Sequence, residues 1–452
     1  TAATVGAATT ANAPTGTPTF ATGQLQSKTV GATGCATNAA GEPAIHVSRA
    51  NNLFAGSELG LGGGSELWRQ IGTTGGSGAS ACALQYRGQP NTIATGVGLA
   101  GGDIDVAIAS AKNSSGNYNV YVASLNLASV NVATSIDNGT TFSQTPVQAG
   151  LPLDDREWIA AYGAQTSLLT YHDVASSEID VLRSDNSGLL YHEIGQAIPL
   201  TSAAATNNEL GNIVVDHDNT AGTTTSKLDL SGAGGFWAYQ SFVAPKTSSD
   251  SNLDEMFVAV SNNGGYNWID RPIGCSYEPG VNIDHNFPNV SVAPNGTVWA
   301  SWSDDAHVYT AVSSDHGVRW SCSGAVSAGL RRAIFPWLAA TSRGVDLVYY
   351  ATSDPTGPSM TWSVYLSQNP TSTSTGWGTP TRVSSVHRGD VCEGGVTCTT
   401  GRQLFDDFGV DTDNRGNAHI VYSHDSPSLG GSSTYTGYAV QTAGRIVGTP
   451  NN

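Results

Sequence analysis

The sequence predicts an all-β fold, a single β-propeller with seven four-stranded blades, six blades being the alternative. Three observations support this: a turn-rich composition, a recurring strand–turn–strand unit, and a turn motif in register with that unit. Of 452 residues, 39% are hydrophobic, only 12% are charged and 54 are glycine, as in a packed β protein. A four-stranded unit cannot bury both faces alone, and radial repetition covers its faces and protects its edges.

The clearest copy of the unit runs from Asp284 to Trp302 and continues from Ser313 to Trp320. Each copy has a polar start, a short apolar strand, a turn and a second strand with alternating large side chains. Aligning the copies on Pro288 gives seven anchor positions: Pro43, Ile104, Glu157, Gly211, Pro288, Pro336 and Asp406. We expect each anchor to lie at the start of the innermost strand of one blade.

The turn motif is Ser-x-Asp/Asn-x-Gly-x-x-aromatic. It occurs at Ser135–Phe142, Ser184–Tyr191, Ser261–Trp268 and Ser313–Trp320, and a degenerate copy spans Ser367–Trp377. The acidic or amide side chain caps backbone N–H groups of its own turn, glycine adopts positive φ, and the aromatic side chain packs between sheets. The capping residues are therefore predicted to be Asp137, Asn186, Asn263 and Asp315. All four hairpins should lie on one face of the ring.

Residues 1–28 are rich in Thr, Ala, Gly and Pro and almost uncharged, which is typical of an extended arm or linker. Residues 29–452 then form the propeller. The last unit is short after its anchor Asp406, so we expect the ring to close with a strand taken from residues 17–24.

Six cysteines without CxxC spacing predict disulfides rather than a zinc site. Sequence alone permits fifteen pairings, and we predict the three between nearby segments: Cys35–Cys82, Cys275–Cys322 and Cys392–Cys398. Disulfides favour a secreted, extracellular or cell-surface location. The formal net charge of −17 makes nucleic acid and anionic membranes unfavourable partners, and no apolar run is long enough for a transmembrane segment.

The turn motifs resemble the Asp boxes (BNR repeats) of secreted bacterial sialidase-like proteins, and the resemblance covers the chain from about Glu42 to Val440. It implies a carbohydrate-related site. In a sialidase, three arginines hold the substrate carboxylate, and a Tyr–Glu pair and an Asp perform the chemistry. The first of these arginines stands in an Arg-Ile-Pro motif, but here that position reads Glu42-Pro43-Ala44-Ile45. True sialidase activity is therefore not expected.

The starts of the innermost strands and the ends of the second strands share one face of a propeller, so polar residues there are the candidates for a site. The candidate catalytic residues are Arg156, His172, Asp173, Tyr350, His424 and Asp425. The candidate binding residues are Glu42, Glu209, His285, Asp304, Arg332, Arg402 and Asp407. The cofactor is unknown, with calcium possible, and Asp103 and Asp105 are the candidate ligands.

Arg156 has two interpretations. It could hold an acidic group of a substrate, or it could bridge blades with Asp155 and Glu157 as local partners; we favour the structural role.

Two functions from different classes fit these patterns. The first is recognition or processing of an extracellular glycan at this face, by a glycoside hydrolase or polysaccharide lyase if the chain is an enzyme. The second is a non-catalytic surface or matrix protein, in which the N-terminal arm links subunits by self-association.

Overall fold

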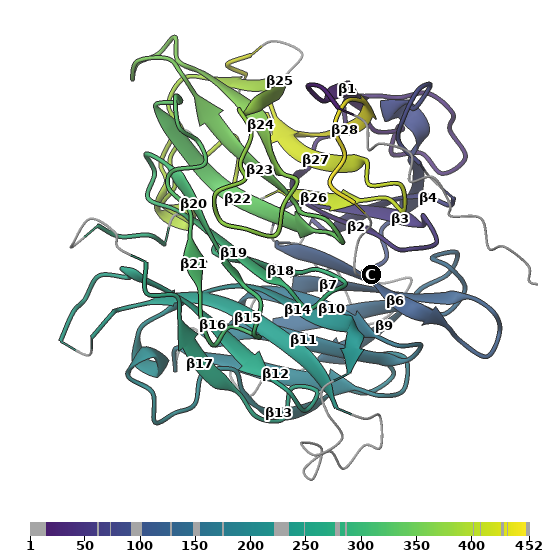
Figure 1. Cartoon of the computed structure of the whole chain (residues 1–452). Helices are drawn as coiled ribbons and strands as arrows, with labels where there is room; N and C mark the ends of the chain where they lie inside the picture. Colours follow the sequence, from purple (N-terminus) through teal and green to yellow (C-terminus); the bar gives the residue numbers. More distant parts are fainter. Residues whose placement is uncertain are drawn as a thin grey trace, which may run out of the picture.

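The computed structural model confirms the predicted architecture, with seven four-stranded antiparallel sheets arranged as a β-propeller (Figure 1). Figure 1 shows the sheets in chain order, with the yellow C-terminal strands returning beside the purple N-terminal ones. The structure describes residues 15–60, 63–72, 74–91, 102–126, 129–147, 154–173, 176–220, 235–247, 249–275, 281–284, 287–400, 402–406, 408–425, 429–431 and 433–448.

Six blades contribute their strands in chain order from the centre outward, and the seventh takes the N-terminal strand as its outermost one. The innermost strands are β2 (Gly41–Val47), β6 (Ile104–Lys112), β10 (Asp154–Tyr162), β14 (Glu209–Thr220), β18 (Asn289–Val292), β22 (Arg332–Ala340) and β26 (Gly409–Thr412). The second strands are β3 (Leu53–Glu58), β7 (Tyr118–Asn126), β11 (Thr166–Asp173), β15 (Phe236–Ala244), β19 (Val298–Ser303), β23 (Val345–Thr352) and β27 (Ala418–His424). Each of the seven anchors lies within an innermost strand or up to three residues before it, with Glu157 and Pro336 further into their strands than predicted.

The outer half of each blade is also regular. The third strands are β4 (Ser65–Gln70), β8 (Ser129–Ser135), β12 (Glu178–Ser184), β16 (Glu255–Ser261), β20 (Val308–Ser313), β24 (Thr361–Asn369) and β28 (Tyr435–Ala443). The fourth strands are β5 (Gln85–Gly88), β9 (Ser143–Val147), β13 (His192–Gln196), β17 (Ile269–Pro272), β21 (Ser321–Cys322), β25 (Thr381–Arg388) and β1 (Thr19–Gln24). In the part of the chain that the structure describes, three short 3₁₀ helices lie in connections: η1 (Ala81–Ala83), η2 (Ala203–Thr206) and η4 (Gly395–Thr397).

Because neighbouring strands are antiparallel throughout, the ring has two distinct faces. We call the face where innermost strands begin the upper face, and the face that carries the turns between third and fourth strands the lower face. We number the blades one to seven, from the blade of β2 to the blade of β26.

The ring closes through the N-terminal strand. β1 pairs antiparallel with β28, with Phe20 opposite Gln441 and Gln24 opposite Gly437. This confirms the predicted closure by residues 17–24, and it removes two open sheet edges. Residues 1–14 of the predicted arm lie outside the described residues. Residues 19–24 of the same predicted arm form β1, which pairs with β28 of its own chain.

Four lower-face hairpins share one set of local hydrogen bonds. In the hairpin of the second blade, the Ser135 hydroxyl donates to Asp137 (2.7 Å) and accepts from the Gly139 amide (2.8 Å), and Asp137 accepts from the Thr141 amide (2.9 Å). The same three bonds recur at the hairpins that begin at Ser184, Ser261 and Ser313. The turn motif therefore has the structural role that its residues predict.

Adjacent blades are joined by apolar packing and by side chains that reach the next innermost strand. Buried residues of the third and fourth blades, among them Trp158 and Phe242, form one continuous cluster. Asp105 accepts from the Ile159 amide of the next blade (2.9 Å), and Asn289 accepts from the Leu338 amide (2.7 Å). These bonds satisfy backbone groups that a flat sheet would leave unpaired.

All three predicted disulfides are present. Their Cα–Cα distances are 5.7 Å for Cys35–Cys82 and 5.9 Å for both Cys275–Cys322 and Cys392–Cys398. Disulfides form and persist in oxidising compartments, which fits an extracellular protein. Within the described part of the chain, no helix has the length and hydropathy needed to cross a membrane.

Candidate functional site

A ring of carboxyl groups stands at the centre of the upper face. Six of the seven blades contribute one at the start of the innermost strand or just before it: Glu42, Asp103, Asp155, Glu209, Asp284 and Asp406. The sixth blade presents Arg332 instead. Below this carboxyl ring, a central cavity of 130 Å³ is lined by all seven innermost strands. The radial topology thus brings together residues that are far apart in sequence.

The backbone is irregular where these side chains project. Glu42 (φ 44°) and Arg156 (φ 47°) adopt positive φ, and the strand register shifts at the same positions in β2 and β10. Phe335 (φ 55°) and a register shift mark the same place in β22. Non-glycine residues rarely adopt this conformation, and such strain persists only where the surrounding contacts enforce it. Each shift re-aims the side chains at the start of its strand.

Arg156 is the buried centre of the site. Its side chain is only 2% exposed, and its Nη1 lies 3.1 Å from Asp103 Oδ1 and 3.8 Å from Glu42 Oε2. Its guanidinium carbon lies 4.0 Å from the centre of the Trp158 ring and 4.8 Å from that of Phe287. Arg156 therefore bridges the third blade to the first and second. We had expected Arg156 to pair with its sequence neighbours Asp155 and Glu157. The ion pairs in the structure are instead with Asp103 and Glu42.

Arg402 provides the second positive charge. Its Nη2 lies 3.1 Å from Glu42 Oε1 and also bonds Asp406. Glu42 is therefore shared between two arginines, and its own carboxyl group donates a hydrogen bond to Asp103. The result is one continuous network from the seventh blade through the first to the second.

The ring contains carboxyl groups in different protonation states. Burial alone would raise the pKa of Asp103, but the Arg156 guanidinium and hydrogen bonds from Glu42 and Arg156 hold it below its usual range. Burial and then the charges of Asp155, Asp284 and Asp406 raise the pKa of Glu209 to about 8. Near neutral pH, Asp103 is ionised while Glu209 is mostly protonated.

Two further carboxyl groups lie beneath the ring. Burial and the charge of Asp103 raise the pKa of Glu58 to about 7. Burial also raises the pKa of Asp105 to about 7, although Asp105 accepts two backbone hydrogen bonds. Glu58, Asp105 and Glu209 are therefore partly or mostly protonated near neutral pH.

Aromatic rings lie beside the carboxyl ring. Trp337 and Phe287 are both only partly buried, and each packs against Trp158, with ring centroids 5.2 Å and 6.0 Å away. Trp337 also lines the central cavity. An aromatic face next to acidic side chains is a common setting for a sugar ring, whose C–H face packs on the aromatic while its hydroxyls bond the carboxylates.

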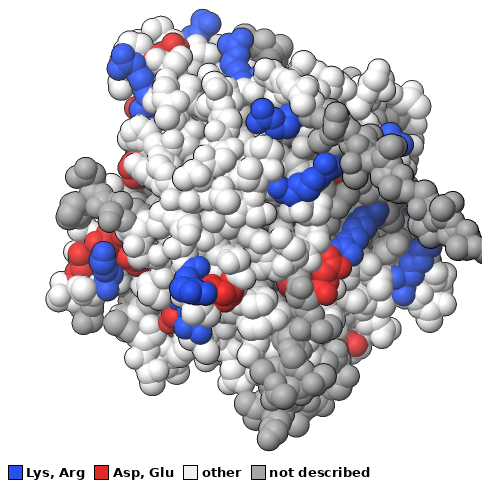
Figure 2. Space-filling view, viewed as in Figure 1, with Lys and Arg blue, Asp and Glu red and all other residues white. Residues whose placement is uncertain are grey.

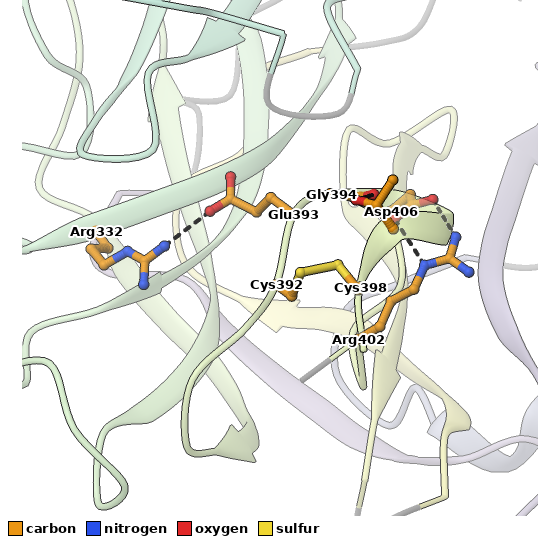
Figure 3. Close-up of a disulfide and its surroundings, with 8 residues drawn as sticks. Arg332, Cys392, Glu393, Gly394, Cys398, Arg402 and Asp406 are labelled. Atoms are coloured by element: carbon orange, nitrogen blue, oxygen red, sulfur yellow. Dashed lines mark hydrogen bonds and ion pairs between the residues drawn. A yellow bond between two sulfur atoms is a disulfide. The ribbon is translucent and has the colours of Figure 1, made fainter. Parts of the chain in front are cut away.

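The connection between β25 and β26 carries the Cys392–Cys398 disulfide and is held from both sides (Figure 3). Arg332 binds Glu393 (3.0 Å) and also Asp305 and Asp390. On the other side, Arg402 binds Asp406. The disulfide-closed loop thus stands between two arginine clusters and fixes the segment that carries Arg402.

Some other candidates make structural contacts at the edge of the upper face. The Tyr350 hydroxyl accepts from the Ser423 amide (2.8 Å), and Asp304 accepts from the Ala306 and His307 amides of its own turn. His424 lies 3.2 Å from Gln24, and burial lowers its pKa to about 4. These contacts join blades and cap turns away from the axis.

Two acid–histidine groups also lie outside the ring. Asp425 Oδ2 lies 2.7 Å from Nδ1 of His387, which our sequence analysis did not select. The other ring nitrogen of His387 lies 3.2 Å from the Asp390 carbonyl oxygen, next to the disulfide loop. His172 is opposite Asp155 in the β10–β11 pairing, and burial lowers its pKa. Burial, and then the charges of Asp173 and Asp180, raise the pKa of Asp154 to about 7.

The two residues that we expected as calcium ligands, Asp103 and Asp105, contact other protein groups. Asp103 binds Arg156, and Asp105 accepts backbone amides. Among the described residues, no three His, Cys, Asp or Glu side chains are placed to hold a metal ion. His285 and Asp407, two of the candidate binding residues, lie outside the described residues.

Sequence reasoning missed several members of the site. Asp155 and Asp284 are ring carboxyl groups that we had not selected, although they are immediate neighbours of Arg156 and His285. Glu58 and Trp337 carried no signal of their own, because each reads as an ordinary residue at a strand end or beside a proline.

Basic residues do not form an extended surface on the face shown in Figure 2. Most of that face is uncharged, and basic and acidic side chains lie there in small groups. This arrangement gives that face no strip of positive charge for a nucleic-acid backbone.

No protein-family model and no curated protein matches the sequence. Among solved structures, a protein of unknown function from Dyadobacter fermentans is similar over 90% of this chain and 95% of its own, with 12% identity and a TM-score of 0.46. The GH74 enzyme of Niastella koreensis is similar over 89% of this chain and 52% of its own (12%, TM-score 0.49). The α-L-arabinanase of Penicillium chrysogenum is similar over 95% of this chain and 98% of its own (11%, TM-score 0.43).

Proposed function

We propose that the upper face binds a glycan at the carboxyl ring and cleaves a glycosidic bond there. The observation that carries this proposal is the pair of unlike carboxyl groups, Asp103 and Glu209, in one ring beside the partly buried aromatic residues Trp337 and Phe287.

Most glycoside hydrolases use one protonated and one ionised carboxyl group that flank the scissile bond. Glu209 is partly exposed and retains its proton near neutral pH, so it is the general acid in this proposal. Asp103 is partly exposed and ionised, so it acts as the base that activates water or as the nucleophile. Arg156 holds Asp103 in place and keeps it ionised, which makes Arg156 a positioning residue.

The site differs from that of a sialidase in what its arginines do. Arg156 is buried against Asp103 and Glu42, Arg402 binds Glu42 and Asp406, and Arg332 binds three carboxylates. An arginine already neutralised by protein carboxylates gains little by binding a substrate carboxylate. The proposed substrate is therefore not a sialylated glycan.

The test is hydrolysis of an oligosaccharide panel between pH 5 and 8, measured by product mass. We expect Glu209→Gln and Asp103→Asn each to lower kcat by about 100-fold or more, because each removes a proton-transfer group. Glu178→Gln changes an upper-face carboxyl group of the third blade outside the ring and should leave turnover unchanged. Turnover that survives both ring substitutions would overturn the assigned roles, and absence of both binding and turnover across the panel would overturn the proposal.

A further inference from the structure

A polar pocket of 550 Å³ lies beside the disulfide loop of the upper face, and its volume is within the usual range for small-molecule sites. Its wall includes the Cys392–Cys398 bridge and continues along the same segment to Gln403. The preceding residue, Arg402, instead bonds the ring carboxyl groups Glu42 and Asp406. Arg402 and Gln403 therefore connect the carboxyl ring to this pocket through a single peptide bond.

Two buried acceptors at the wall of this pocket lack a donor. Gln403 lines the pocket, and its Oε1 atom has no hydrogen-bond partner in the described part of the chain. The fully buried Asp425 uses Oδ2 to bond two residues of the pocket wall, His387 and Gly430, whereas its Oδ1 has no partner among the described residues. A buried acceptor without a donor costs free energy, so this wall favours an occupant that brings hydrogen-bond donors.

The exposed part of the pocket carries groups of the complementary kind. Arg388 is exposed and forms no ion pair in the part of the chain that the structure describes. Thr399 and Thr400 are exposed as well, and their hydroxyl groups bond no described residue. The pocket thus combines acceptors on its buried wall with donors nearer the solvent. Sugar hydroxyl groups both donate and accept, so a sugar ring matches both sets.

We propose that this pocket binds a neutral sugar unit of the glycan that is cleaved at the carboxyl ring. The inference rests on the proposed function and adds a second binding subsite to it. Gln403 accepts a hydroxyl proton of this unit, and Arg388 donates to one of its oxygen atoms. A galacturonate unit suits the pocket less, because its carboxylate brings further acceptors to a wall that already lacks donors.

A sugar unit held here is remote from the groups that react. Its contacts are the same before and during bond cleavage, so they should lower KM and leave kcat unchanged. A disaccharide that occupies the cleavage site does not also fill the pocket, and its KM should not depend on Gln403 or Arg388. This dependence on chain length is a property that a purely structural role of the two residues would not produce.

The experiment measures binding by calorimetry, and hydrolysis by product mass, for cellohexaose, xylohexaose, 1,5-linked arabinohexaose and a galacturonate hexamer. Gln403→Leu and Arg388→Ala should each weaken binding of the preferred neutral hexamer about tenfold and raise its KM by the same factor. The values of kcat, and KM for the matching disaccharide, should not change. Arg382→Ala removes an exposed arginine at the other end of the same strand, β25, and should alter none of these values.

The outcomes separate this inference from the function on which it rests. Unchanged hexamer affinity in both pocket variants would overturn the pocket and leave cleavage at the ring in place. Pocket-dependent binding of a hexamer that is never cleaved would overturn the cleavage and leave the pocket as a sugar site. No binding of any hexamer would overturn both.

Two further results would also reject the pocket as a neutral-sugar subsite. Tighter binding of the galacturonate hexamer that is lost in Arg388→Ala would identify an acidic sugar as the occupant. A fall in kcat that is equal for disaccharide and hexamer would show that Gln403 acts on the ring through Arg402. Because Arg388 is exposed, its variant keeps the test decisive if Gln403→Leu loosens the loop.

Discussion

The lower-face hairpins and the upper-face carboxyl ring use the same kinds of residue in opposite ways. In a hairpin, Asp137 bonds Ser135 and amides within its own turn, a few residues away. In the ring, Glu42 is linked to Arg402, 360 residues away. The hairpin acid bonds its own turn near solvent, whereas Glu42 is buried in the ring and its pKa is raised by burial and by the charges of Asp103 and Asp406.

The difference shows how a repeated fold can acquire a site. Local hydrogen bonds repeat with the sequence motif, so each hairpin stabilises its own blade and all four are alike. At the centre, each blade contributes a different side chain to one place, and the ring can vary without changing the blades. The candidate site residues therefore gather where the repeat is broken, as it is at the irregular starts of β2 and β10.

The largest expected effect comes from removing the charge at the centre of the ring. Arg156→Ala removes the arginine that contacts Asp103 and one of the two arginines that contact the buried Glu42, and we expect a loss of about 3–5 kcal/mol in the free energy of unfolding. Chemical denaturation measures it, with the exposed Arg382→Ala as the matched control. An unchanged melting temperature together with lost glycan binding would show that Arg156 serves the ligand rather than the blades.

The two faces should respond oppositely to pH. Because the pKa values of Glu58 and Asp105 (about 7) and Glu209 (about 8) are raised, the folded state holds extra protons, and stability should fall as the pH rises from about 4 to 8. Asp315, held by Arg319, has a pKa lowered to about 2, so its contribution is lost as the pH falls from about 4 to 2.

Melting curves from pH 2 to 9 test this opposition, and we expect a maximum on the mildly acidic side. Glu209→Gln should flatten the alkaline limb only, and Asp315→Asn the acidic limb only. A melting temperature that rises steadily up to pH 8 would contradict the raised pKa values of Glu58, Asp105 and Glu209.

The disulfide loop of the upper face should matter more for binding than for stability. The Cys392–Cys398 bridge closes a short loop, so replacing both cysteines by serine should cost only about 2 kcal/mol in the loop-entropy estimate. The same change loosens the segment that carries Arg402, and glycan affinity should fall further than the stability change explains. Equal affinity in the double variant and in the parent would show that Arg332 and Arg402 hold the loop without it.

The smallest expected effect belongs to a single hairpin. Asn186→Ala removes hydrogen bonds that are local and exposed, which should cost about 1 kcal/mol. Asn186→Ala and Asp137→Ala lie in different blades, so their effects on the free energy of unfolding should add. Strong non-additivity would indicate that the hairpins cooperate across blades.

The sequence by itself determined the repeated parts of this protein. The period of the strands and the Ser-x-Asp/Asn-x-Gly turns follow from local propensity and hydrophobic pattern, which act over a few residues. The closure by residues 17–24 follows from the repeat, because the last unit is too short to supply all four strands of its blade. The three disulfides were also predictable, because each joins segments that are close along the repeat.

Only the tertiary structure decided the composition of the site. The meeting of Asp103, Arg156 and Glu42 from three blades, and the loss of their solvation, depend on how the blades pack around the axis. A charged residue at a strand start looks the same in sequence whether it caps a turn, like Asp304, or joins the ring, like Glu209. Electrostatic and desolvation energies depend on distance in space and on burial, and neither is written in the local sequence.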